Sequence, residues 1–308
     1  MTRAVVFAYH NVGVRCLKVL LANGVEIPLV VTHEDNPAEQ IWFDSVARTA
    51  ADYELMTIAP LDPNAAEANE RVTACRPDFI FSFYYRAMLR PPLLAIPSRG
   101  ALNMHGSLLP KYRGRVPVNW AIIHGETETG ATLHYMTEKP DAGDIVAQTS
   151  VPILPDDTAH EVFAKVTVAS ELTLVRVLPA LLAGSAPRRK QEAGNASYFG
   201  GRRPEDGIID WSKSATEIHN LVRAVAPPYP GARATLLGRP ARVLRTRVLD
   251  ARSGAASEPA VLVEGERLVA HCAGGGMLAL LSLEIDGEAV DARGFVERFG
   301  GAAVAPGS

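Results

Sequence analysis

Two polar residues in the segment ALNMHGSLLP, Asn103 and His105, have the types and spacing that acyl transfer to an amine needs. They are two positions apart, so on a β-strand their side chains point to the same face. An amide can stabilise a developing oxyanion while a neighbouring imidazole moves a proton. A hydrogen-bonded pair at a strand end would show the same spacing, so a purely structural role stays open on these residues alone.

Three cations follow the pair within five residues, namely Lys111, Arg113 and Arg115. The prolines and glycine around them predict a fixed binding loop. Because arginine binds phosphate oxygens bidentately, we expect this loop to hold a phosphate or diphosphate. A solvated basic loop is the alternative interpretation of the same residues.

Asp141 is a candidate carboxylate partner for the histidine. It lies in EKPDAGDIV, where Pro140 and Gly143 predict a turn between two strands. A carboxylate beside an imidazole fixes its tautomer and raises the pKa of the histidine toward the range useful for proton transfer. A turn-forming aspartate would also fit this position.

Several other chemistries find no support in the motifs. The remaining histidines form no metal-ligand spacing, and neither G-x-G-x-x-G nor G-x-x-x-x-G-K-[ST] occurs, so we expect no metal, no nicotinamide cofactor and no ATP chemistry. The three cysteines are far apart and odd in number, which favours a reducing cytoplasm. The net charge of −3 gives no general positive field, and nucleic acid is not an expected partner.

The elements that must position these residues alternate in the first half of the chain. Short apolar runs separated by helical patterns predict an open α/β sheet whose strands are buried on both faces. Helices are expected to end at Gly24, to begin at Pro37, and to run from Asp156 to Gly184. The strands are expected at residues 4–9, 27–33, 55–60, 78–85, 100–108, 131–137 and 144–153.

The second half differs in pattern. Residues 185–204 are rich in Gly, Ser, Pro and Arg and predict a linker, so we expect a catalytic domain at 1–204 and a second domain at 205–308. One helical pattern and five short strands then predict a small β-barrel. The most apolar stretch, 172–184, is shorter than a membrane span, so no membrane segment is expected.

These motifs together resemble the formyltransferases that use 10-formyltetrahydrofolate. The resemblance rests on Asn103-Met104-His105, the SLLP and Arg-Gly pieces of the next loop, Asp141-Ala142-Gly143, and SYFGGRRPEDGIIDW at 197–211. It extends over nearly the whole chain. It implies a Rossmann-like N-terminal domain without the dinucleotide fingerprint, followed by an OB-like barrel.

The resemblance also implies roles for individual residues. His105 would transfer protons, Asn103 would stabilise the oxyanion, and Asp141 would raise the pKa of the histidine. The implied folate contacts are Ala87, Met88, Leu89, Arg115, Thr137, Glu138, Lys139, Pro140 and Asp141. Because backbone groups make many of these contacts, the side chains alone do not indicate them.

Within the family, FAYHNVG (7–13), FSFYYR (81–86) and NWAIIHGETETG (119–130) are similar to members that formylate the 4-amine of UDP-4-amino-4-deoxy-L-arabinose, in lipid A modification and polymyxin resistance. A small-molecule UDP-amino sugar is therefore the implied acceptor. Such members often carry a fused decarboxylase. Since this chain ends at Ser308, we expect any decarboxylase to be a separate protein with which this one could associate.

Three alternatives stay open. A methionyl-tRNA formyltransferase would share the three catalytic candidates, but it would need a basic insertion, whereas residues 33–44 contain four carboxylates and no Lys or Arg. The acceptor could instead be another nucleotide-linked amino sugar. A folate- or nucleotide-binding module without turnover would show the same motifs.

Overall fold

The computed structural model describes residues 1–251, 258–300 and 305. The chain packs as two units. Unit 1 comprises residues 1–117, 128–151 and 163–200, and unit 2 comprises residues 118–127, 152–162 and 201–308. Two short segments of the predicted catalytic domain thus belong to the second unit, and the domain boundary near residue 204 stays a prediction.

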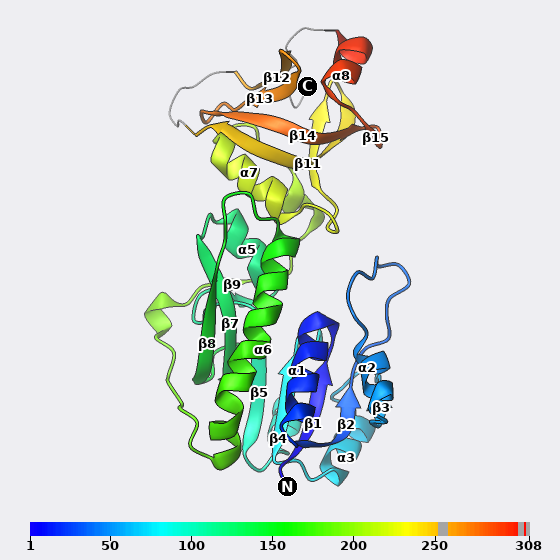
Figure 1. The fold of residues 1–308 in the computed structure, drawn as a ribbon, viewed down its shortest axis with the longest axis vertical. Coiled ribbons are helices and arrows are strands. Elements are labelled where there is room, and N and C mark those ends of the chain that lie inside the picture. Colours follow the sequence, from blue (N-terminus) through cyan, green and yellow to red (C-terminus); the bar gives the residue numbers. More distant parts are fainter. Residues whose placement is uncertain (252–257, 301–304, 306–308) are drawn as a thin grey trace. The chain divides into compact units, whose positions relative to one another are not determined.

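Unit 1 is built on a seven-stranded sheet in the order β3-β2-β1-β4-β5-β7-β8 (Figure 1). The first five strands in this order are parallel, and β7 runs antiparallel to β5. The strands are β1 (Arg3–Ala8), β2 (Glu26–Val31), β3 (Thr57–Ile58), β4 (Phe79–Phe83), β5 (Gly100–His105), β7 (Glu128–Tyr135) and β8 (Ile145–Pro152). The predicted open α/β sheet and its seven strands are confirmed.

Helices connect these strands, in the order expected from the sequence. They are α1 (His10–Ala22), α2 (Val46–Asp52), α3 (Ala66–Ala74), α4 (Pro91–Leu94), α5 (Pro117–Ile123) and α6 (Ala159–Ala183). Of these, α5 after Pro117 and the first residues of α6 belong to unit 2. Gly24 and Gly184 follow α1 and α6 with φ of 70° and 76°, the left-handed geometry that ends a helix. The predicted ends of both helices are therefore confirmed.

The helix predicted from Pro37 is wrong in its first part, because α2 begins only at Val46. Ser45 caps it by accepting a hydrogen bond from the N–H of Arg48. The residues before it instead make contacts with other elements. Tyr9 donates its hydroxyl to Asp35, at 2.7 Å. Such contacts replace the hydrogen bonds of a helix.

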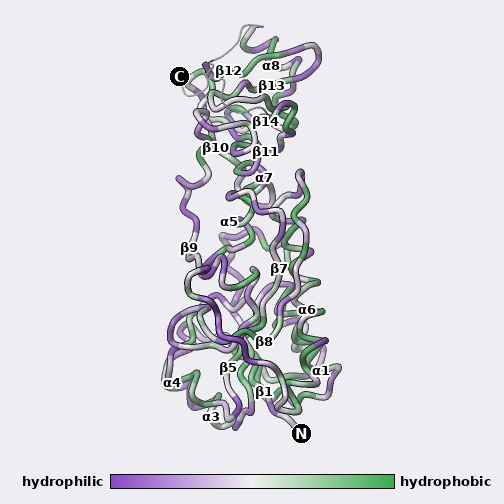
Figure 2. The backbone as a smooth tube through the Cα atoms, turned by 90° about the vertical axis from the view of Figure 1, so that its left-hand side faces the viewer, coloured by the Kyte–Doolittle hydropathy of each residue, from purple (hydrophilic) through white to green (hydrophobic). Residues whose placement is uncertain are grey.

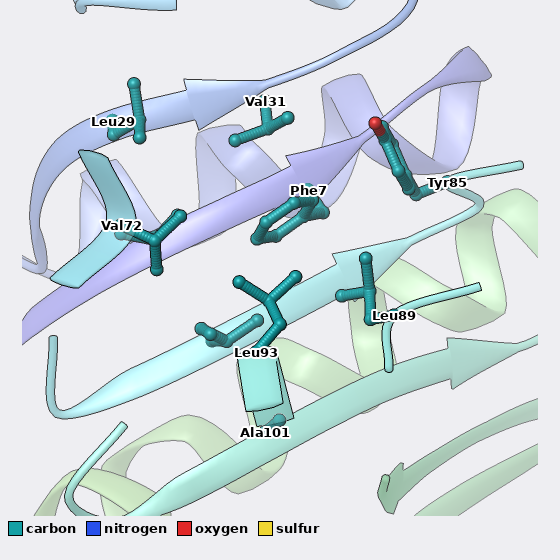
Figure 3. Packing of buried hydrophobic residues seen from close by; sticks show 10 residues of the cluster. Phe7, Leu29, Val31, Val72, Tyr85, Leu89, Leu93 and Ala101 are labelled. Carbon is teal, nitrogen blue, oxygen red and sulfur yellow. The ribbon is translucent and has the colours of Figure 1, made fainter. Parts of the chain in front are cut away.

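The core of unit 1 lies on both faces of the sheet, since successive strand residues point to opposite sides. Figure 3 shows one face, where Phe7 of β1 packs with Val72 of α3 and Leu93 of α4. On the other face α1 and α6 lie side by side (Figure 1), joined by an ion pair between Arg15 and Glu171 at 2.6 Å. Each fully buried Phe or Leu side chain contributes about 1.5–3 kcal/mol to the free energy of unfolding, relative to an exposed one.

Helix α6 is long and apolar enough to cross a membrane by length and composition alone. Half of its most apolar stretch is buried inside the protein, as in a core helix packed on a sheet.

The polar residues around β9 (Tyr198–Phe199) stand out as hydrophilic in Figure 2. Strand β9 itself pairs in parallel with β6 (Arg113–Gly114), which lies in the loop after His105.

Unit 2 contains an antiparallel sheet in the order β10-β11-β14-β13-β12, with β15 paired to β14. Its elements are the 3₁₀ turn Pro204–Gly207, α7 (Ala215–Ala224), β10 (Ala232–Leu236), β11 (Arg239–Asp250), β12 (Ala260–Glu264), β13 (Arg267–His271), β14 (Met277–Ile285), β15 (Glu288–Ala289) and α8 (Ala292–Phe299). A capping box between Ser214 and Glu217 starts α7. The prediction of a small β domain after one helix is confirmed.

Candidate active site

Strand β5 carries two of the predicted catalytic residues. Asn103 and His105 alternate along the strand with the buried Leu102 and Met104. Both therefore point to the face that also carries Ala101 of the buried cluster. His105 is only 6% exposed. The register with the antiparallel β7 places Asn103 opposite His134. Asn103 and His105 therefore lie on one strand and share one face, as their spacing predicts.

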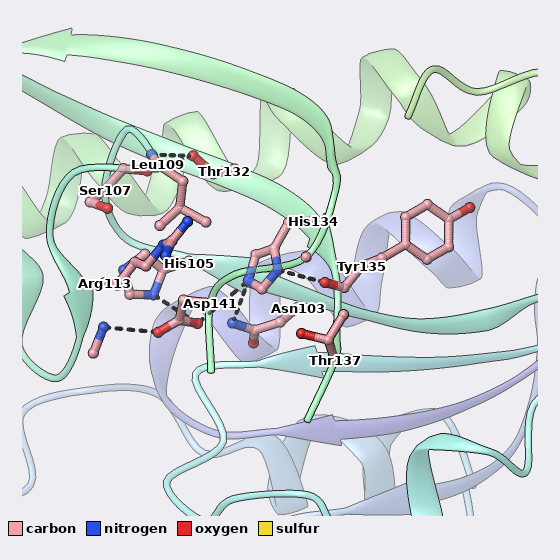
Figure 4. Close-up of polar contacts among 12 residues, drawn as sticks. Asn103, His105, Ser107, Leu109, Arg113, Thr132, His134, Tyr135, Thr137 and Asp141 are labelled. Carbon is pink, nitrogen blue, oxygen red and sulfur yellow. Dashed lines mark hydrogen bonds and ion pairs between the residues drawn. The ribbon is translucent and has the colours of Figure 1, made fainter. Parts of the chain in front are cut away.

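Asp141, in the loop between β7 and β8, joins this cluster (Figure 4). Its Oδ1 lies 3.6 Å from Nδ1 of His105, and its Oδ2 accepts a 2.9 Å hydrogen bond from the N–H of Gly114. Burial raises the pKa of this carboxyl, but the charge of His105 and the Gly114 N–H are among the contributions that oppose burial, and together these hold the pKa well below its usual range. Asp141 is therefore an ionised carboxylate at neutral pH.

The backbone around Asp141 is held in a rare conformation. Asp141 has φ = 52°, in the left-handed region that non-glycine residues seldom adopt and in which Asp is among the more frequent of them. Gln191 stabilises the turn, because its Nε2 donates to the carbonyl oxygens of Asp141 and Gly143 at 2.8 and 2.7 Å. A Cβ at Gly143 would lie 1.9 Å from the carbonyl oxygen of Tyr135. The glycine is thus required for the turn to pack against β7.

Arg113 has a different role from the phosphate contact expected of it. It is 7% exposed, and its Nε and Nη2 donate to Oε1 of Gln191 at 3.2 and 2.8 Å. The guanidinium is thus used inside the protein, where it holds the side chain that fixes the Asp141 turn. Lys111 and Arg115 are exposed, and the Arg115 side chain has no partner in the part of the chain that the structure describes.

The second ring nitrogen of His105 is fixed by the following loop. Nε2 lies 2.7 Å from the carbonyl oxygen of Tyr112, and a carbonyl only accepts, so Nε2 carries a proton. Tyr112 is itself held: its N–H donates to Ser197 Oγ at 2.8 Å, and its ring stacks on Phe199 with centroids 5.2 Å apart. The composition of residues 185–204 predicts a linker, yet Ser197 and Phe199 in this segment help to orient the histidine. The aromatic pair Tyr198-Phe199 in an otherwise polar stretch is the sequence signal that could have indicated this role.

His134 belongs to the same cluster, although the sequence patterns did not indicate it. It is 1% exposed, and its Nδ1 lies 2.8 Å from the carbonyl oxygen of Tyr135. Its Nε2 lies 3.2 Å from Nδ2 of Asn103 and 3.5 Å from Oδ1 of Asp141. Its place in the strand predicted at residues 131–137 was the one sequence signal for His134. That signal is not enough, because the pairing of this strand with β5 cannot be deduced from spacing.

The first predicted folate segment packs against the core cluster of Figure 3. Ala87 rests on the cluster and the side chain of Leu89 is part of it, whereas Met88 is 55% exposed. The carbonyl of Met88 accepts a hydrogen bond from Nδ2 of Asn64 at 2.9 Å. Among the described residues, the backbone N–H and C=O of Ala87 and Leu89 have no hydrogen-bond partner. Such groups are suited to bind a ligand.

The second predicted folate segment leads from β7 into the Asp141 turn and consists of Thr137, Glu138, Lys139 and Pro140. Met136, directly before it, packs on the same cluster as Ala87. Thr137 donates its hydroxyl to the carbonyl of Lys139 at 2.9 Å. Thr137 also lines, with Ala101 and Gly143, a cavity of about 450 Å³, a volume typical of small-molecule sites. Both segments therefore border one side of the sheet.

Within residues 1–251 and 258–300, no group of three or more His, Cys, Asp or Glu side chains is placed to hold a metal ion. The cluster around His105 contains a single carboxylate. The groups that it offers for chemistry are an amide, two imidazoles and that carboxylate.

Two family models match this chain. The formyl transferase model covers residues 5–178, and the formyl transferase C-terminal domain model covers residues 202–300. Because the two matches span most of the sequence, the chain belongs to the formyltransferase family and is a formyl-transferring enzyme.

Solved structures of N-formyltransferases share this fold. An N-formyltransferase from Helicobacter canadensis, in complex with folinic acid and dTDP-3-aminofucose, has a TM-score of 0.74 and 20% identity, over 91% of this chain and 99% of that chain. WlaRD, a sugar 3N-formyl transferase solved with dTDP and 5-N-formyl-THF, has a TM-score of 0.72 and 19% identity, over 94% and 99%. A 4-N formyltransferase from Francisella tularensis has a TM-score of 0.61 and 21% identity, over 75% and 91%.

Proposed function

We propose that this protein transfers the formyl group of 10-formyltetrahydrofolate to the 4-amine of UDP-4-amino-4-deoxy-L-arabinose, in the cytoplasm, as a step of the lipid A modification that gives polymyxin resistance. The observation that carries the chemistry is the cluster of Asn103, His105 and Asp141 on one face of β5. It combines an amide donor, a proton carrier and a partly buried carboxylate, the groups that formyl transfer to an amine uses.

The reaction follows from these groups. The neutral sugar amine attacks the formyl carbon, and the carbonyl oxygen becomes an oxyanion that an N–H of Asn103 stabilises. His105 accepts the proton that the amine loses and returns it to N10 of the folate as the bond from carbon to N10 breaks. Asp141, 3.6 Å from Nδ1, stabilises the imidazolium between these steps. The products are the formamido sugar and tetrahydrofolate.

The free backbone groups of Ala87 and Leu89 support folate as the formyl donor. A pteridine ring carries hydrogen-bond donors and acceptors along its edge, and backbone N–H and C=O groups can pair with them. Arg115 is exposed and without a partner among the described residues, so we propose that it binds an anionic group at the mouth of the site.

Charge favours a sugar nucleotide over a tRNA as acceptor. Residues 33–44 contain four carboxylates and no Lys or Arg, and Glu39 is paired with Arg86 at 2.8 Å. A surface that meets tRNA phosphates needs unpaired cations. The similar solved structures include a dTDP-3-aminofucose complex and a 4-N formyltransferase, which supports an amino sugar as the acceptor class. A separate decarboxylase stays a predicted partner.

The experiment offers 10-formyltetrahydrofolate with each of three acceptors: UDP-4-amino-4-deoxy-L-arabinose, a dTDP-linked 3-amino sugar and charged initiator tRNA. Mass spectrometry follows the addition of one formyl group. We expect product with the UDP sugar, and none with His105→Ala under the same conditions.

Each of the other possible outcomes would point to one of the alternative functions. Product with the dTDP sugar alone would replace the acceptor but keep the chemistry, and formyl-methionyl-tRNA would overturn the sugar class. Folate binding with no product from any acceptor, unchanged in His105→Ala, would contradict the assigned reaction and favour a binding module.

A further inference from the structure

A second buried imidazole lies between two of the residues assigned to catalysis. Nε2 of His134 is 3.2 Å from Nδ2 of Asn103 and 3.5 Å from Oδ1 of Asp141. The register of β5 and β7 makes Asn103 and His134 direct neighbours on one face of the sheet. No step of the proposed reaction uses this imidazole.

The backbone determines which nitrogen of His134 carries the proton in the neutral ring. Nδ1 lies 2.8 Å from the carbonyl oxygen of Tyr135, which can only accept, so the proton is on Nδ1. Nε2 of the neutral ring is then an acceptor. The group that faces it must be a donor, which is the NH₂ group of the Asn103 amide.

This contact determines the orientation of the amide. One N–H of Asn103 is used by His134, and the second N–H has no partner in the described part of the chain. If the amide rotated by 180° about its last bond, the carbonyl oxygen would face the Nε2 lone pair, and two acceptors would oppose each other. The neutral imidazole thus excludes that orientation.

We propose that His134 is a positioning residue, which in its neutral form holds the Asn103 amide with its free N–H available to the oxyanion. The proposal rests on the proposed formyl transfer. Protonation reverses the arrangement: an Nε2–H would turn toward the Asp141 carboxylate and oppose the Asn103 NH₂, so the amide loses its anchor. Asp141 and His105 are the titratable groups that face His134, with ring centroids of the two imidazoles 6.5 Å apart.

Two matched variants separate anchoring from packing. His134→Leu keeps an apolar volume but removes the acceptor, and we expect kcat to fall about 10- to 100-fold, part of the usual cost of an oxyanion donor, with KM for folate nearly unchanged. In His134→Gln the Oε1 atom can accept the same N–H. We expect the kcat of this variant to stay within about fivefold of the wild type.

A measurement without substrate tests the structural part separately. Protein labelled with ¹⁵N-histidine should show His134, assigned by its absence in His134→Gln, as the Nδ1–H tautomer at pH 7.5. An Nε2–H tautomer or a doubly protonated ring would overturn the proposal, as would wild-type kcat in His134→Leu or equal losses in both variants. If His134→Leu does not fold, the tautomer and the kcat of His134→Gln decide. If the wild type formylates no acceptor, the proposed function fails, while the tautomer still decides the orientation of Asn103.

Discussion

The hydroxyl of Tyr84 packs directly against Gly106, the residue that follows His105. A Cβ added to Gly106 would lie 2.0 Å from that oxygen, and the next nearest atom, Cζ of the same ring, would lie 3.1 Å away. Tyr84 follows the last residue of β4 and has φ = 56°. The ends of β4 and β5 therefore meet at the point where the chain leaves the histidine.

Gly106→Ala is expected to lower both stability and kcat, because the new methyl group overlaps the Tyr84 hydroxyl. Overpacking of this kind costs about 1–3 kcal/mol, and a displaced His105 can lose up to about 100-fold in rate. Urea unfolding and kcat measurements would check this. Since the overlap is with the hydroxyl, Tyr84→Phe combined with Gly106→Ala should recover part of the loss. A double variant no better than Gly106→Ala would show that the backbone, not the hydroxyl, sets the limit.

Replacing either group that acts on the transition state should greatly slow formyl transfer. We expect Asn103→Ala and His105→Ala each to lower kcat by about 100-fold or more. Asp141→Asn keeps the shape of the turn but removes the charge that stabilises the imidazolium, so it should reduce kcat by a similar order. Steady-state rates with saturating folate test this, with tetrahydrofolate binding as the control for an intact fold. A variant of Asn103 with wild-type kcat would exclude that amide as the oxyanion donor.

Much of the fold could be predicted from local patterns. The strand positions in unit 1, the ends of α1 and α6, and the helix and strands of unit 2 follow from apolar periodicity and capping residues that act within a few positions. The shared face of Asn103 and His105 follows from the period of a strand. These features depend on neighbours in the sequence, which is why the sequence alone predicts them.

Contacts between distant segments could not be predicted in this way. His134 reaches Asn103 through the pairing of β7 with β5, and Gln191 reaches Asp141 from a segment that composition describes as a linker. Arg113 was expected to bind phosphate, whereas its hydrogen-bond partner is Gln191, 78 positions away. Spacing does not report such long-range partners, and a single sequence offers no other signal for them.

Gln191 should be essential to the geometry of the Asp141 turn. Gln191→Met removes the acceptor of the buried Arg113 and both donors to the turn, so we expect a loss of about 1–3 kcal/mol and at least a tenfold lower kcat. Gln191→Glu keeps an acceptor for Arg113 but no donors, so stability should fall less while kcat still falls. Thermal unfolding and kcat of the two variants provide the comparison. Wild-type kcat in Gln191→Met would show that the turn holds without these hydrogen bonds.

A buried histidine in unit 2 should make stability depend on pH. His219 donates from Nε2 to the carbonyl of Pro155 at 3.0 Å, and its Nδ1 accepts from the hydroxyl of Thr246 at 2.9 Å. Burial lowers the pKa of His219; the Pro155 carbonyl opposes this shift, Arg223 adds to it, and Asp156 opposes it. The neutral ring is thus the form that the folded unit binds.

The sign of the effect follows from proton binding. In the unfolded chain a histidine has a pKa of about 6.5, so as the pH falls through this value the unfolded state takes up a proton that the folded state does not. The free energy of unfolding therefore decreases from about pH 7 downward until the folded pKa is reached. His219→Gln keeps hydrogen-bonding groups but cannot titrate, so its stability deficit at pH 7.5 should shrink toward pH 5.5. Urea unfolding at a series of pH values measures this, and a deficit that stays constant with pH would show that His219 is protonated equally in both states.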